Sequence, residues 1–477
     1  MRKLLVAAVG FVTVLMAMPV YAVDVNFSGE AWVRGFWTDN QTDGNSSYDD
    51  HTRFADGRFR LKTAIKAGVT TGVVVVDFAN CYPSNPAPGG STGSTINNSI
   101  SSLGNTGNCR FGTGGLGNSD NVVGLREAYL KIDLTKVGFV LGRQTLKLGH
   151  GIIFDTTGDA VTAILPLNGS TLTASMIQVN DANAFGTVPG INNDTTVWMV
   201  NLGMDRGNHV INIYDAYLYD QTPATTLGSS FYPTVDGPLT TSPGPFGNDK
   251  IWINYLGVSL DAKAGSLNLA FEGTYDFGSL EAATAAAGPD IRVGGWNLMG
   301  DVTADTGGAR LGGTVVVTSG QSPSAVGSAN IADISGNFQL GNILVNGEMN
   351  TDRDGSSLSG GAGVPGGIGG AGLFAVKLHA DMMPSDRLDV GGAVIFAQTT
   401  AQPCGGCQRN IGYELDANSK YQVDDNLAVL VGAGYLITGS GAADFYNVYN
   451  TANLGPPPVT GSNSNIWKLS AKVVFTF

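Results

Sequence analysis

The chain has little of what soluble enzymes and helical membrane proteins are built from. Charged residues make up only 14% of its 477 residues, and it contains four cysteines and four histidines. Beyond residue 22, no segment holds the run of roughly 20 apolar residues that a membrane-spanning helix needs. Hydrophobic residues nevertheless make up 43% of the sequence. The apolar surface must therefore be spread thinly along the chain, as it is in β-barrels.

The histidines give no sign of catalytic or metal chemistry. His51, His150, His209 and His379 are scattered, and none has a partner at metal-ligand spacing. No serine lies two positions from His379, and His150 falls in a predicted turn, so a Ser–His pair of the lipase kind is not expected. We therefore predict no metal, no cofactor and no enzymatic activity.

The cysteines are even in number, which suits an oxidising compartment. The simplest pairing joins Cys404 to Cys407 and Cys81 to Cys109. A redox-active Cys404-Gly-Gly-Cys407 motif is the alternative, although no thioredoxin-like βαβ context surrounds it. Residue 408 is Gln where a c-type haem site needs His, so haem attachment is excluded.

The carboxy-terminal segment shows the pattern of a membrane-facing strand. Trp467, Leu469, Ala471, Val473, Phe475 and Phe477 alternate with Lys468, Ser470, Lys472, Val474 and Thr476. Only a β-strand, whose side chains change face at every residue, turns this alternation into one apolar and one polar face. A final strand that ends on an aromatic residue is typical of outer-membrane β-barrels and is the kind of signal that the barrel-assembly machinery recognises.

The amino-terminal segment predicts export. Met1, Arg2 and Lys3 form a short positive region, an apolar stretch follows, and Val20-Tyr21-Ala22 fits a cleavage site. We predict a signal peptide over residues 1–22 and one domain over residues 23–477. The expected location is the outer membrane of a Gram-negative-type bacterium, in contact with its lipids and lipopolysaccharide.

Alternating segments recur along the whole chain and predict an all-β, transmembrane, antiparallel up-and-down barrel. Ten upward strands begin near Val25, Thr71, Val137, Ser170, Asn208, Gly265, Gly308, Asn342, Arg387 and Asn426. Ten downward strands begin near Arg53, Val122, Asp159, Asp194, Lys250, Ile291, Asn330, Gly372, Asn410 and Asn465. The count is about 20, or 18 if weak segments such as Asp159 to Pro166 are not strands. Both termini are expected on the periplasmic side, with short turns there and long polar loops outside, the largest over about 80–121.

Alternation also predicts which charged side chains face the lumen. In the first two strands Phe27, Val33 and Phe59 face lipid, which leaves basic residues inside. Closure brings the last strand beside the first. The predicted basic, anion-selective stripe consists of Arg34, Arg58, Arg60, Lys62, Lys66, Lys468 and Lys472.

Other strands place carboxylates inside the barrel. The predicted acidic lumen residues are Glu30, Glu272, Asp276, Glu348, Glu414 and Asp416. Basic residues on one wall and acidic residues on another would create a transverse field that screens solutes by charge. The alternative is that these charged side chains only hydrate the lumen. They would then face inward simply because lipid excludes charge from the outer face.

The segment from Ala128 to Val161 reads AYLKIDLTKVGFVLGRQTLKLGHGIIFDTTGDAV. Its Gly142-Arg143-Gln144, Gly149, Phe154-Asp155 and Asp159-Ala160-Val161 resemble the alginate-export family of outer-membrane barrels, whose arginine-lined pore conducts an anionic polysaccharide. The resemblance covers less than a tenth of the chain. It implies that Arg143 lies in the constriction with Lys147 nearby, that Asp155 lies at the turn into the next strand, and that the barrel is monomeric.

Together these features predict a porin that passes small or chain-like polar solutes passively and favours anions. The alternative is a structural barrel that sheaths a partner such as a multihaem cytochrome, and a third reading is a barrel-anchored adhesin. The net charge of −13 argues against a nucleic-acid partner.

Overall fold

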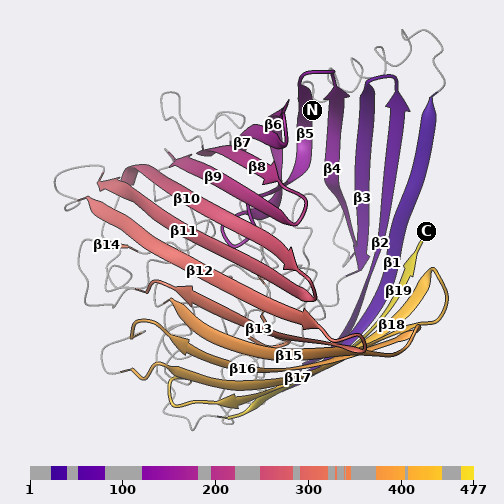
Figure 1. Cartoon of the computed structure of the whole chain (residues 1–477), viewed down its shortest axis with the longest axis vertical. Helices are drawn as coiled ribbons and strands as arrows, with labels where there is room; N and C mark the ends of the chain where they lie inside the picture. Colours follow the sequence, from indigo (N-terminus) through magenta and orange to yellow (C-terminus); the bar gives the residue numbers. More distant parts are fainter. Residues whose placement is uncertain are drawn as a thin grey trace.

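The computed structural model describes residues 23–39, 52–80, 121–180, 195–220, 248–282, 290–320, 328–329, 338, 340–344, 372–402, 407–442 and 464–477. Nearly all of these residues lie in long antiparallel strands, wound in chain order around a central space (Figure 1). The strands are β1 (Asp24–Asp39), β2 (Thr52–Ala67), β3 (Thr70–Asn80), β4 (Asn121–Asp133), β5 (Gly138–Lys147), β6 (Asp155–Leu167), β7 (Ser170–Asn180), β8 (Thr195–Asp205), β9 (His209–Asp220), β10 (Asn248–Ala264), β11 (Leu267–Ala282), β12 (Ile291–Asp305), β13 (Ala309–Thr318), β14 (Ser328–Ala329), β15 (Leu373–Ser385), β16 (Leu388–Thr399), β17 (Asn410–Gln422), β18 (Leu427–Thr438) and β19 (Ile466–Thr476).

The sheet closes on itself, which leaves no open edge. β19 pairs antiparallel with β1, with Phe475 opposite Ala31 and Lys472 opposite Arg34. The chain end is tied in as well, because the backbone N–H of Phe477 donates to the Gly29 carbonyl at 3.1 Å. Closure satisfies the backbone hydrogen-bonding groups that an open sheet would leave exposed to lipid.

The closed barrel has 18 strands, the lower of the two predicted counts. β14 is a two-residue segment that pairs in parallel with β12, while β13 pairs directly with β15. The strand predicted from Asn342 is not formed at its described start: residues 342–344 form a bend and a turn that are not part of the wall, and the later residues of that prediction lie outside the described ranges. The weak segment from Asp159 to Pro166 is part of a strand, β6, which already begins at Asp155.

Connections alternate in length as expected for a barrel of this class. β4–β5, β6–β7, β8–β9, β15–β16 and β17–β18 are joined by short turns at the end of the barrel where β1 begins and β19 ends. The connections at the opposite end are longer. The chain therefore enters and leaves the barrel at the same rim, the one predicted to be periplasmic.

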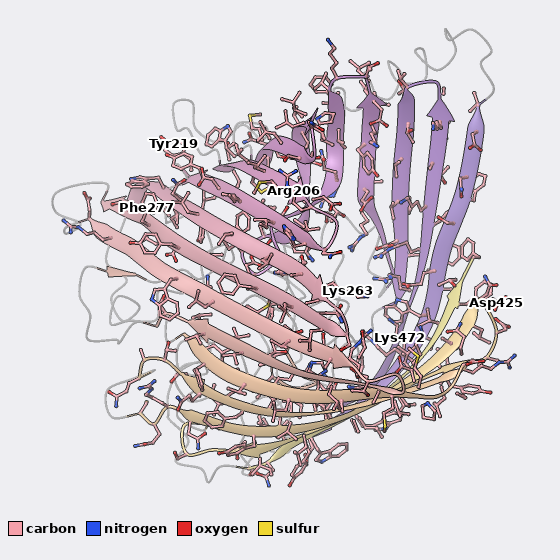
Figure 2. All side chains as sticks on the ribbon, in the orientation of Figure 1. Arg206, Tyr219, Lys263, Phe277, Asp425 and Lys472 are labelled. Carbon is pink, nitrogen blue, oxygen red and sulfur yellow. The ribbon has the colours of Figure 1, made fainter. Side chains whose placement is uncertain are left out.

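The two faces of the wall have the predicted polarity. On β1 the side chains of Phe27, Val33 and Trp37 are exposed, at 63%, 64% and 39%, whereas Trp32 and Phe36 are buried. The same outward alternation continues around the ring, and aromatic side chains such as Tyr219 and Phe277 lie toward the long-loop rim, away from Lys263 (Figure 2). An apolar exterior with aromatic residues at its rim is the surface of a transmembrane barrel.

Several predictions concern residues outside the described ranges. These are the signal peptide over 1–22, the loop over about 80–121 with Cys81 and Cys109, the start of the strand predicted near Asn330, Glu348, and Cys404. Cys407 is described, and it is buried and disulfide-bonded. Within the ranges given above, no helix is both long enough and apolar enough to cross a membrane.

Candidate functional site: the lumen wall and two segments folded into it

The closure seam between β19, β1 and β2 gathers cations around two aromatic rings. The Arg34 guanidinium carbon lies 4.7 Å from the Trp32 ring centroid and 4.3 Å from that of Phe36. Lys472 Nζ lies 5.0 Å from the Trp32 ring, Lys468 Nζ lies 5.3 Å from the Phe36 ring, and Arg58 adds a contact to Trp32 at 5.2 Å. Arg34, Arg58 and Lys468 are buried, and cation–π contacts stabilise positive side chains that are removed from water. The structure thus brings four of the predicted basic residues together.

The basic side chains of β2 are partly neutralised by carboxylates on the neighbouring strands. Arg58 Nη2 donates to Glu30 Oε1 on β1 at 2.7 Å. Arg60 makes a bidentate pair with Asp77 on β3, through Nε to Oδ1 at 2.6 Å and Nη2 to Oδ2 at 2.8 Å. The adjacent strands β1 and β3 therefore supply counter-charges to this part of the basic stripe.

Asp77 is a functional residue that sequence reasoning missed. It is fully buried and follows the run Val73 to Val76. It shares the parity of Val73 and Val75, which are also buried on the inner face. The sequence does contain a signal for Asp77. It is a single carboxylate at an inward-facing position of an apolar strand, and the neighbouring strand has arginines at inward-facing positions.

Lys62 and Lys66 lie farther along the inner face of β2, opposite Ser28 and Asp24 of β1. Both side chains are exposed in the lumen. They lie on the same face of β2 as Arg58 and Arg60 and extend the row of basic side chains toward the short-turn rim.

Arg143 does not join this stripe. It pairs across the sheet with Ala128 and Asp159, and Arg143 Nη1 lies 3.6 Å from Asp159 Oδ1. Asp159 shares its face of β6 with Val161, which is 50% exposed on the outside of the barrel. On the same outer face, Asp159 lies opposite Gln178 of β7, Gln178 lies opposite Thr196 of β8, and Thr196 lies opposite Tyr219 of β9. The register therefore turns Arg143 outward, at the level of the aromatic rim, rather than into a constriction.

The connection between β5 and β6, residues 148–154, folds into the barrel. Leu148, Ile153 and Phe154 are at most 2% exposed and pack with the inward side chains Tyr214 and Tyr255 on β9 and β10. Lys147 and Asp155 lie at the base of this segment, where Lys147 Nζ is 3.3 Å from Asp155 Oδ2. We call residues 148–154 the inner hairpin tip.

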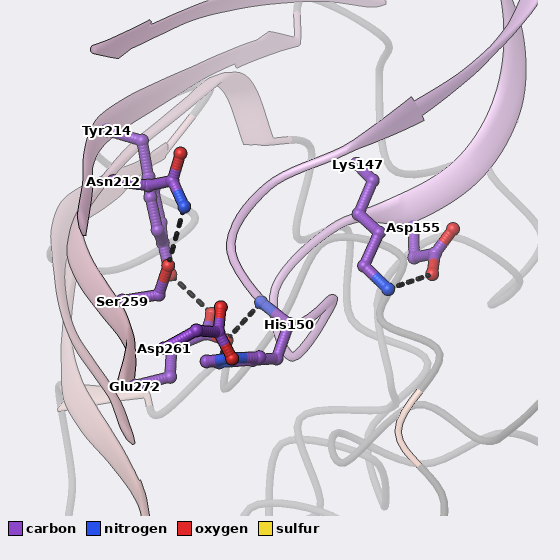
Figure 3. A network of polar contacts seen from close by, with 8 residues as sticks. All are labelled: Lys147, His150, Asp155, Asn212, Tyr214, Ser259, Asp261 and Glu272. Atoms are coloured by element: carbon purple, nitrogen blue, oxygen red, sulfur yellow. Dashed lines mark hydrogen bonds and ion pairs between the residues drawn. The ribbon is translucent and has the colours of Figure 1, made fainter. Parts of the chain in front are cut away.

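Polar contacts fix the inner hairpin tip to the wall (Figure 3). Glu272 on β11 is fully buried and accepts hydrogen bonds from the His150 backbone N–H at 2.5 Å and from the Tyr214 hydroxyl. Gly149 has a φ of +53°, and a Cβ there would lie 2.7 Å from the Glu272 carboxylate. The close approach of the tip to Glu272 therefore requires glycine. Glu272, predicted to line the pore, instead anchors this segment.

A second segment, residues 340–344, folds against the inner face of β15 to β18. Leu340, Ile343 and Leu344 are at most 2% exposed and belong to one buried cluster with Ile395 and Leu436. Ile152 of the inner hairpin tip is in the same cluster, so one apolar core includes residues of both segments. We call residues 340–344 the inner loop.

Carboxylates also hold the inner loop. The backbone N–H groups of Ile343 and Leu344 donate to the two oxygens of Glu414 at 2.6 and 2.7 Å. The Asn342 N–H donates to Asp416 Oδ2 at 3.2 Å, and Lys377 Nζ donates to the Leu340 carbonyl at 2.8 Å. Glu414 and Asp416 were predicted as lumen charges, but the structure uses them to bind backbone N–H groups.

The remaining wall opposite the seam carries mixed charge. Asp276 is fully buried on β11. Nearer the short-turn rim, Asp261, Lys263 and Asp301 line a cavity of about 400 Å³. Among the described residues, no group of three or more His, Cys, Asp or Glu side chains could hold a metal ion. The arrangement can attract, orient and exclude solutes by charge and width.

Comparisons with solved structures support the fold. The chain is similar to Pseudomonas aeruginosa OccK9 (OpdG), with a TM-score of 0.52, 12% identity, and 95% of this chain and 99% of that chain covered. It is also similar to a BenF-like porin from Pseudomonas fluorescens, with a TM-score of 0.51, 11% identity, and 95% and 98% covered. For the P. aeruginosa outer membrane protein OpdK the values are 0.50, 12%, and 95% and 99%. No family model and no curated protein matches the sequence.

At these identities the likeness concerns the fold. The predicted outer-membrane β-barrel architecture is confirmed, and it is the fold of solved outer-membrane porins. The comparisons give no support to the alginate-export family in particular.

Proposed function

We propose that the protein is an outer-membrane channel through which small polar solutes pass passively, with a preference for anions. The observation that carries this proposal is the cluster of Arg34, Arg58, Lys468 and Lys472 around Trp32 and Phe36 on the lumen wall. An 18-stranded barrel is wide enough for a water-filled lumen. Positive side chains along one wall lower the energy of an anion in that lumen.

The two inner segments favour small solutes over a folded partner or a polysaccharide. The inner hairpin tip and the inner loop cover wall surface on β9 to β11 and on β15 to β18. A multihaem cytochrome threaded through the barrel would need that surface, so the sheath hypothesis is disfavoured. Passage of an anionic polysaccharide, as in the alginate-export family, would require both segments to move.

Solute uptake by proteoliposomes tests the proposal directly. Liposomes that contain the purified protein should swell faster in a small monocarboxylate than in an amine of similar size, and control liposomes should not swell. Equal swelling rates for the two solutes would contradict the proposed anion preference. The absence of swelling with either solute would contradict the proposed channel function. Lipopolysaccharide and the barrel-assembly machinery are the expected cellular partners.

A further inference from the structure

His150 lies between two carboxylates that belong to different strands (Figure 3). Its Nδ1 is 3.1 Å from Glu272 Oε2 on β11, and its Nε2 is 3.0 Å from Asp261 Oδ1 on β10. Carboxylates accept hydrogen bonds, so each ring nitrogen should carry a proton to fit its partner. Neutral imidazole has only one N–H, whereas the imidazolium ion has two. The contacts of His150 are therefore those of its protonated form.

The other polar groups near this contact include neutral side chains and two lysines. Asn212 and Ser259 are neutral, and Tyr214 donates its hydroxyl to Glu272. On the hairpin itself, Lys147 is paired with Asp155, and Lys263 is the next inward residue of β10 after Asp261. The hydrogen bond to Glu272 raises the pKa of His150 above its ordinary value, burial opposes this change, and Asp261 raises the pKa further.

We infer that His150 is a positioning residue, which in its protonated form holds the inner hairpin tip against the lumen wall and so sets the width of the channel according to pH. This inference rests on the proposed channel function and adds regulation to it. When the His150 imidazolium loses one of its two ring protons, one of the two carboxylates faces a ring nitrogen that can no longer donate a hydrogen bond. The tip then retains the backbone N–H of His150 and its apolar contacts, but it loses the charged pair.

The sign of the pH effect follows from the direction of the pKa shift. A raised pKa in the docked state means that docking is strongest at pH values below the ordinary histidine pKa and weakens as the pH rises through the raised value. Loss of one charge-assisted hydrogen bond should change the ratio of docked to released tips by roughly tenfold. Release should widen the lumen.

Single-channel conductance of the full-length protein in planar bilayers tests this inference. Wild-type conductance, or the fraction of time in the larger conductance level, should rise between about pH 5.5 and about pH 8.5. His150→Gln keeps a polar side chain but cannot titrate, so its conductance should not follow pH. His379→Gln is the matched control, because His379 contacts Asp301 and Asp381 on the wall and does not touch the tip. It should retain the wild-type pH response.

Asp261→Asn provides a second route if His150→Gln does not assemble. Removal of one carboxylate should lower the pH at which conductance rises. Hydrogen exchange of residues 148–154, corrected for intrinsic rates, should increase over the same pH range. A pH-independent wild-type channel, a His150→Gln variant that still follows pH, or an unchanged Asp261→Asn midpoint would overturn the inference. A protein that never conducts, but whose tip exchanges with the expected pH dependence, would instead count against the proposed channel.

Discussion

At the scale of single residues, ion pairs on the inner face differ in character from those at the outer rim. Arg60 and Asp77 form a bidentate pair in which Asp77 is fully buried. Arg143 and Asp159 form a longer contact in which the Asp159 side chain is 68% exposed. Burial strengthens the first pair and makes its disruption costly, whereas solvent and salt screen the second.

Asp77→Asn should destabilise the barrel and increase its anion preference. The substitution removes the Asp77 charge from its pair with the Arg60 guanidinium, which is 22% exposed. We expect a loss of about 1–3 kcal/mol in the free energy of unfolding, below the usual cost for a fully buried pair because Arg60 reaches water. Heat- or urea-induced unfolding, followed by the gel mobility of the folded barrel, measures this loss. Asp159→Asn is the matched control and should change stability by less than about 1 kcal/mol. Equal effects of the two variants would contradict this assignment.

Parity at single residues explains both a success and an error of the sequence argument. Phe27 and Val33 point outward as predicted, which places Arg34 inside. Arg143 was assigned to the pore by family resemblance, although it shares parity with Phe139 and Leu141, and the register follows parity. Contacts such as His150 with Glu272 join residues 122 positions apart. No local pattern contains that information.

At the scale of elements, the inner hairpin tip and the inner loop are held to the wall by the same kind of contact. Each is rich in apolar residues, and each brings a glycine beside a wall carboxylate. The inner hairpin tip donates one backbone N–H to that carboxylate, and the inner loop donates two. A Cβ on Gly341 would lie 2.7 Å from Glu414 Oε1. The sequence predicted a strand from Asn342 because apolar and polar residues alternate there. That apolar face packs on the inner wall of the barrel instead of facing lipid.

Gly149→Ala should release the inner hairpin tip. The positive φ at this position costs a residue with a Cβ about 1–3 kcal/mol, and the new methyl group would also press on the Glu272 carboxylate. We expect faster hydrogen exchange over residues 148–154 and a larger single-channel conductance. Gly300→Ala is the control, since a Cβ at Gly300 meets no atom within 4 Å. If both variants behave like wild type, the tip does not depend on this close approach.

Glu414→Gln should release the inner loop. The amide offers one acceptor oxygen where the carboxylate offers two, and its NH₂ group would face a backbone N–H. Each charged hydrogen bond that is lost should weaken docking by about 1.5–3 kcal/mol. Increased exchange at residues 340–344, with a larger conductance, is the expected result. Asp381→Asn, a change at a side chain that is 47% exposed, serves as control. Unaltered exchange in Glu414→Gln would refute the anchoring role.

At the scale of the whole molecule, the sequence predicted what local periodicity determines. The positions of the wall strands, the short turns, the closure of β19 on β1 and the two faces of the wall follow from alternation, whereas the strand predicted from Asn342 does not form part of the wall. The contents of the lumen do not follow from alternation, because they depend on which segments fold inward and on which carboxylates bind those segments. Charges that looked like pore lining, at Glu272, Glu414 and Asp416, are used to hold those segments. In the basic stripe, Arg58 and Arg60 are paired with carboxylates on the adjacent strands, Glu30 and Asp77.

The reversal potential of the purified wild-type protein in a planar bilayer under a KCl gradient tests the central claim most directly. The positive seam predicts an anion-selective channel, and Lys62→Gln with Lys472→Gln should shift the reversal potential toward that of cations. A cation-selective wild-type channel, or a reversal potential that the two substitutions leave unchanged, would contradict the account.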